Sequence, residues 1–137
     1  MADITITVDA RAVTALLGSA PQRLEQAMRG TLEDASSYFV ARMKIYPATR
    51  PNQRYIRTGT LGRSWSRKPV TRTASGWQTV VGSNGAIAPY NRYVQSRPDQ
   101  SRIHRGRWQT AQDVAEASQS QVQRFLDARV RAALGGI

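Results

Sequence analysis

The feature that most constrains this chain is a stripe of apolar residues in its first third. These residues recur at steps of four or three, which places them on one face of an α-helix: Leu24, Met28, Leu32, Ala35, Phe39 and Met43. The pattern predicts a long helix that Ser19 caps and Pro47 ends. Such a helix is stable only when its apolar face packs against another layer, so the rest of the chain must supply one.

Three short segments have the composition of β-strands. Residues 3–9 alternate isoleucine or valine with threonine, which predicts a half-buried strand. Residues 67–73 and 77–81 are rich in valine and threonine, and Gly76 supplies a turn between them. Pro69 places the first of this pair at a sheet edge or delays its start. Together these segments predict a small antiparallel sheet.

The remaining segments are predicted to be helices. A second long helix is expected over residues 108–134, ended by Gly135. Shorter helices are expected over residues 10–17, 58–65 and 89–95, although two glycines weaken the middle one.

This order of segments predicts one α+β domain over residues 1–137, a size that suits a single domain. Its small antiparallel sheet is expected to pack against the long N-terminal and C-terminal helices. The loops at residues 47–57 and 96–107 are basic and contain prolines, so they are expected to be extended and mobile.

The charge of the chain is concentrated in its middle. The whole sequence has 20 basic and 9 acidic residues, for a net charge of +11. Residues 42–107 hold fourteen of the basic residues and a single acid, Asp99, for a net charge of +13. This asymmetry indicates a polyanion or an acidic protein surface as a neighbour. A solvated, arginine-rich surface is the simpler alternative.

The composition lacks most of the side chains that enzymes commonly use for catalysis. The chain has no cysteine and one histidine, His104, whose arginine neighbours are expected to lower its pKa. Asp113 and Glu116 share a helix face, but acids at a helix N-terminus are typical of a solvated end. We therefore expect no catalytic residue, no cofactor and no metal. The opening Met1-Ala2-Asp3-Ile4 is unlike a signal peptide, and no apolar run is long enough to span a membrane.

Nucleic-acid binding fits the composition better than catalysis. Basic and aromatic residues are mixed in two places, Arg50-to-Arg57 and Arg102-to-Trp108, where arginines on phosphates and stacked aromatic rings are physically reasonable. No recognition helix or zinc finger is visible. Trp65, Trp77 and Tyr93 are expected in the core instead, and the role of Tyr55 stays open.

Two stretches, taken together, resemble one family. Arg57-Thr58-Gly59-Thr60-Leu61-Gly62-Arg63-Ser64-Trp65 is similar to a Thr-Gly-x-Leu-x-x-Ser segment of phage morphogenesis proteins. Val81-Gly82-Ser83-Asn84 and Ala88-Pro89-Tyr90-Asn91-Arg92-Tyr93-Val94-Gln95 resemble two further segments of that family. The chain departs from the pattern at Gln95, where an acid is common, and at Ser96-Arg97-Pro98, where Phe-Gly-Thr often follows. The family comprises the tail-completion, or head–tail joining, proteins of long-tailed bacteriophages.

The resemblance implies a structural virion protein of the phage neck and not an enzyme. Such a protein would form a homo-oligomeric ring, expected to be a hexamer, that completes the tail and joins it to the head around the DNA channel. Its partners would be the tail terminator and the head-closure, stopper or connector proteins, with genomic DNA nearby and no membrane. It would reside in the virion, and in the host cytoplasm during assembly. The alternative is a basic nucleic-acid-binding module that acts alone.

The resemblance also assigns roles to residues. The motif positions are expected to pack the short helices on the sheet and the long helices, with Leu61 paired to Trp65 and Tyr90 to Val94, and with Gly59 and Pro89 setting the entry geometry. These positions are Thr58, Gly59, Leu61, Ser64, Trp65, Gly82, Pro89, Tyr90, Tyr93 and Val94. The candidate contacts to partner proteins or DNA are Arg50, Arg54, Arg57, Arg102, Arg105 and Arg107. Protein carboxylates are the favoured partners, because a lining of unpaired arginines would hold sliding DNA.

Overall fold

The fold is α+β, as the sequence predicts. A computed structural model describes residues 3–9, 21–53 and 57–135. Strand β1 (Asp3–Asp9) comes first and the long helix α2 (Pro21–Met43) follows it. The helix predicted over residues 10–17, its stop at Gly18 and the cap at Ser19 lie outside the described residues.

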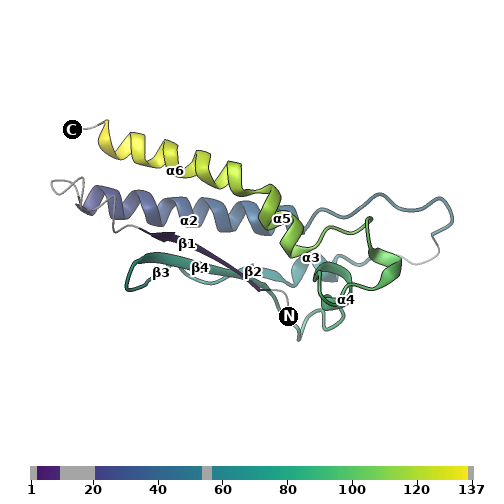
Figure 1. Ribbon diagram of the computed structural model, residues 1–137. Helices are drawn as coiled ribbons and strands as arrows, with labels where there is room; N and C mark the ends of the chain where they lie inside the picture. Colours follow the sequence, from purple (N-terminus) through teal and green to yellow (C-terminus); the bar gives the residue numbers. More distant parts are fainter. Residues whose placement is uncertain (1–2, 10–20, 54–56, 136–137) are drawn as a thin grey trace.

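Helix α2 is the central layer of the molecule. All six residues of its predicted stripe are buried, with exposures of 2% or less. The sheet lies on one side of α2 and helix α6 (Gln119–Leu134) on the other (Figure 1). Tyr38 of α2 meets Phe125 of α6 edge to face, with ring centroids 5.9 Å apart. The helix ends at Met43, four residues before Pro47, which has no N–H to donate to the Met43 carbonyl in a continued helix.

The sheet is antiparallel and has β4 (Gly76–Ser83) at its centre. Strand β1 pairs with one side of β4, with Ile4 opposite Val81. On the other side lie β2 (Trp65–Arg67) and β3 (Thr71–Arg72). The exposed Pro69 stands between them, so the predicted edge strand starts earlier than expected and is interrupted at its proline.

The C-terminal helix is divided in two. It begins at Ala111 rather than at Trp108, as helix α5 (Ala111–Ala117), and α6 follows after Ser118. Thr110 caps α5 through a capping box: its hydroxyl accepts from the Asp113 N–H at 3.1 Å, and its own N–H donates to the Asp113 carboxylate at 2.9 Å. This cap explains the late start of the helix.

One end of the molecule is built from short elements and loops. Figure 1 shows α3 (Thr60–Arg63) and α4 (Arg92–Gln95) at this end, away from the chain's C-terminus. The 96–107 loop contains a single 3₁₀ turn, Arg102–His104. The main core, formed by α2, α5 and the sheet, includes Trp65 and Val81 of the motif segments, whereas Leu61 and Val94 belong to a separate cluster at this loop end.

Candidate functional site

The segments that resemble the phage family meet at the loop end. Leu61 from the first segment and Ala88 and Val94 from the second form one buried cluster with Trp108, and Tyr46 packs against it. Two hydrogen bonds join the segments directly. The Ser64 and Ser83 hydroxyls lie 2.9 Å apart, and the Trp65 indole N–H donates to the Gln95 side-chain oxygen at 2.8 Å.

The two motif glycines differ in how strictly glycine is required. Gly59 precedes α3 with φ of +78°, a region that other residues enter only with strain. Gly82 lies in β4, where an added Cβ would come 2.2 Å from a carboxylate oxygen of Asp3. Thr58 and Thr60 hold the turn at Gly59 by a hydroxyl pair 2.7 Å apart.

The expected aromatic packing is only partly right. Trp65 is buried but lies on strand β2, so it does not share a helix with Leu61. Tyr90 and Tyr93 are 46% and 45% exposed, which makes the expected core position of Tyr93 and the docking role of Tyr90 wrong. Helix α4 begins only at Arg92, so Pro89 and Tyr90 lie in the turn before it. The half-buried Trp77 is flanked by Arg29 and Arg72, whose guanidinium carbons lie 5.2 and 5.6 Å from the ring centroid.

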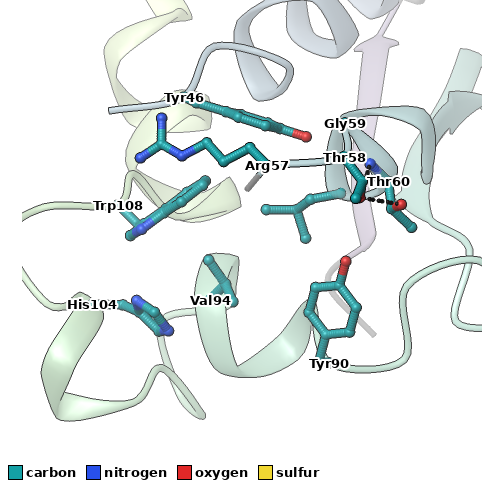
Figure 2. Close-up of a pocket in the computed structure, with 10 residues that line it drawn as sticks. Tyr46, Arg57, Thr58, Gly59, Thr60, Tyr90, Val94, His104 and Trp108 are labelled. Carbon is teal, nitrogen blue, oxygen red and sulfur yellow. Dashed lines mark hydrogen bonds between the residues drawn. The ribbon is translucent and has the colours of Figure 1, made fainter. Parts of the chain in front are cut away.

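A pocket of about 300 Å³ opens at this loop end (Figure 2). Its walls come from the loop after α2, from both motif segments and from the 96–107 loop. The lining residues are Tyr46, Arg57, Thr58, Gly59, Thr60, Leu61, Tyr90, Val94, His104 and Trp108. Most of them are apolar or aromatic, as in many ligand and peptide pockets.

Arg57 is part of the pocket wall. Its guanidinium carbon lies 5.6 Å from the ring centroid of Tyr46 and 5.3 Å from that of Trp108, so the group contacts both rings, whose centroids are themselves 5.3 Å apart (Figure 2). One of its amino groups also donates to the carbonyl oxygen of Pro47. Arg57 therefore holds the loop end together, which differs from its expected role as a surface contact.

The other candidate arginines differ in how firmly they are held. Arg107 donates to the Ala48 carbonyl at 2.9 Å, and the Arg105 Nε donates weakly to the Gln100 carbonyl at 3.4 Å. Arg50 and Arg102 are exposed on the surface. Arg54 lies outside the described residues.

His104 is a neutral member of the pocket wall. Burial lowers its pKa below the usual value of 6.5, and the nearby charges of Arg107 and Arg50 lower it further. The arginine effect matches the sequence expectation, although burial is the larger cause. Its Nδ1 and the Nε1 of Trp108 are buried and have no hydrogen-bond partner among the described residues.

Sequence reasoning gave no role to Gln100 and noted Gln95 only as a departure from the family pattern. The buried amide of Gln100 donates to the carbonyls of Val94 and Trp108 at 2.8 and 2.9 Å, which fixes the 96–107 loop. Gln95 accepts from Trp65 and donates to the Met43 carbonyl at 3.3 Å. No local pattern marks such residues, because their partners lie elsewhere in the sequence.

Arg97 joins the 96–107 loop to helix α5. Its guanidinium donates to Asp113 at 2.6 Å and to Glu116 at 2.8 Å. The hydrogen bond from Arg97 lowers the pKa of Glu116, and the backbone N–H of Thr110, followed by Arg97, lowers the pKa of Asp113. The two acids thus serve a loop contact as well as the helix N-terminus.

Further observations bear on function. Over residues 3–9, 21–53 and 57–135, no group of three or more histidine or acidic side chains is arranged to hold a metal ion. Among the same residues, no helix has the length and apolar character of a membrane span. Comparison with protein-family models, with curated proteins and with solved structures found no match.

Proposed function

We propose that this chain is a structural protein of the neck of a long-tailed bacteriophage. It would act without catalysis, as one subunit of a ring, expected to be a hexamer, that completes the tail and joins it to the head around the DNA channel. Its neighbours would be the tail terminator and the head-closure or connector proteins.

One observation carries this proposal: the segments that resemble the family form a single packed unit. The Ser64 and Ser83 hydroxyls are in contact, so one motif segment bonds to the other, and Leu61 of the first packs with Val94 of the second. Gly59 stands where a side chain would be strained. Motif positions with such defined packing roles are expected of a true family pattern, whereas a chance match would scatter them.

The contacts of the basic residues favour protein partners over bare DNA. Three arginines of the basic middle are already paired with acids of the chain, which leaves fewer unneutralised charges for phosphates: Arg72, Arg92 and Arg97. Binding that relies on phosphates needs many unengaged cations, because each neutralised phosphate adds to the affinity. A subunit that meets acidic neighbours needs only a few, placed at its contact surface.

The test is deletion of the gene from the phage that encodes the chain, followed by electron microscopy of the lysate. The expected result is filled heads and free tails instead of joined particles, with joining restored by the gene supplied in trans. Joined, infectious particles formed without the chain would contradict the proposal, as would its absence from purified virions by mass spectrometry.

A further inference from the structure

We propose that the loop-end pocket binds an acidic segment of a different protein through one large apolar side chain. The pocket is the first reason. At about 300 Å³ it is larger than the cavity of ~150 Å³ that accepts benzene in an engineered protein core, so an aromatic or leucine side chain fits. Leu61, Val94 and Trp108 supply an apolar surface for such an anchor.

Two nitrogens in the pocket wall are buried and have no hydrogen-bond partner among the described residues. Trp108 is 7% exposed, and its indole N–H has no acceptor among the described residues. The nitrogen is covered by the surrounding chain, so it can reach an occupant's oxygen only if the pocket wall moves. His104, also on the wall, has an unpartnered Nδ1 within the same part of the structure.

The charge around the pocket selects an acidic occupant. Arg57 lines the pocket, and Arg50 and Arg107 lie close enough to His104 to lower its pKa. Asp99 is the one acid of residues 42–107, and its carboxylate oxygen Oδ2 lies 4.0 Å from the Nε of Arg92. Carboxylates beside the apolar anchor would therefore be attracted to the pocket's rim.

A second copy of this chain is a poor source of those carboxylates. Ion pairs within the chain already engage five of its nine acids: Glu25, Asp34, Asp99, Asp113 and Glu116. The occupant is therefore assigned to another, acidic protein. Its place in the phage neck rests on the proposed function, whereas the pocket's preference for an acidic, apolar peptide does not.

The test uses the full chain and a blocked synthetic peptide, Asp-Glu-Leu-Phe-Asp-Glu. Titration is followed by NMR of the three tryptophan indole N–H groups. Saturable movement of the Trp108 signal is expected, while the Trp65 signal, whose N–H is held by Gln95, serves as the internal control. Replacing Leu-Phe by Ala-Ala, or the acids by Asn and Gln, should abolish saturation.

Two exposed arginines provide matched variants. Arg50→Ala should weaken peptide binding about two- to fivefold, the range for one exposed ion pair. Arg131→Ala, which removes an equal charge from the exposed surface of α6, should leave the affinity unchanged. Equal weakening by both variants would show a general charge effect and overturn the assignment.

Further outcomes would overturn the proposal or assign the pocket to another ligand. Binding of the Ala-Ala or the neutral peptide as tightly as the parent peptide would overturn the proposal, as would failure of the parent peptide to bind. Movement of the Trp108 signal with duplex DNA alone would assign the pocket to nucleic acid, and its movement on raising the protein concentration alone would assign it to a second copy. A peptide that binds a chain found not to be a neck protein would uphold the pocket and contradict only the proposed function.

Discussion

The indole nitrogen of Trp65 donates a hydrogen bond of 2.8 Å to the side-chain oxygen of Gln95, and both residues are buried. The amide nitrogen of Gln95 in turn donates to the carbonyl of Met43, at the end of α2. A single amide thus connects the sheet, the long helix and α4. Gln95 occupies the position at which the phage family that this chain resembles often has an acid.

Gln95→Glu is therefore expected to destabilise this chain. A carboxylate still accepts from Trp65, but when ionised it has no hydrogen to donate to the Met43 carbonyl, and it brings a charge into a buried site. The expected cost is about 1–3 kcal/mol of unfolding free energy at pH 7, measured by urea titration. Gln26→Glu, at an exposed position of α2, is the control. An unchanged midpoint for Gln95→Glu would show that the Met43 bond contributes nothing.

Leu61→Ala is expected to remove the centre of the loop-end cluster. Leu61 is 6% exposed and packs with Val94 and Trp108, so its truncation should cost about 2–5 kcal/mol. Ile103→Ala, at a side chain that is 70% exposed, should change stability by less than about 0.5 kcal/mol. Thermal unfolding of both variants is the measurement, and equal melting midpoints for Leu61→Ala and the unsubstituted chain would refute the packing assignment.

Gly59→Ala should reveal the strain at the start of α3. With φ of +78°, an alanine there is expected to cost about 1–2 kcal/mol. Gly106→Ala offers a matched comparison, because its φ is +73° and nothing lies within 4 Å of an added Cβ. Any excess cost at Gly59 reports the contact with Arg63, which an added Cβ would approach at 3.1 Å. Gly59→Ala with full stability would contradict the left-handed turn.

The Asp113 contacts predict a loss of stability in acid. The Thr110 N–H and Arg97 lower the pKa of Asp113 in the folded chain, so this carboxylate stabilises the fold above its unfolded pKa of 3.8. That stabilisation is lost as the pH falls from about 5 through the folded pKa. The stability difference between the unsubstituted chain and Asp113→Asn should therefore shrink in acid. Asp127→Asn, on α6, is the control, and a difference that grows in acid would reverse the assignment.

Replacing Arg50 and Arg102 together by alanine tests what the surface charge contacts. Both side chains are exposed, so the fold should be retained. Loss of head–tail joining, counted by electron microscopy, is expected if these arginines meet carboxylates of neighbouring subunits. Normal particle numbers with altered DNA ejection kinetics would show that they serve the DNA instead.

The sequence predicted the layers of the fold because hydrophobic periodicity controls them. The stripe from Leu24 to Met43 is buried as its spacing requires. The position of Trp65 was harder to predict: four residues after Leu61 it fits a helix, yet pairing with Ser83 places it in a strand. Tyr93 was expected in the core from its residue type alone, although its ring instead faces Arg92, at 4.8 Å from the guanidinium carbon.

The site was less predictable because its contacts connect distant segments. Arg57 looked like one more surface arginine, since nothing near it in the sequence reveals that it packs against both Tyr46 and Trp108. Gln100 likewise gains its role only when the chain turns back past Val94. Local patterns record a residue's neighbours in the chain, whereas these roles depend on tertiary contacts.

The contact of Arg57 with both aromatic rings has a consequence for the two basic loops. With the Arg107 bond to Ala48, it ties the loop that follows α2 to the one that precedes α5. Loops that hold each other in place have few conformations left to lose when a partner binds. Most of their conformational entropy is therefore already lost when the chain folds, and not on binding. The loop end is therefore a preorganised binding surface. Arg57→Ala would release one loop from the other and so raise the entropic cost of binding a partner there.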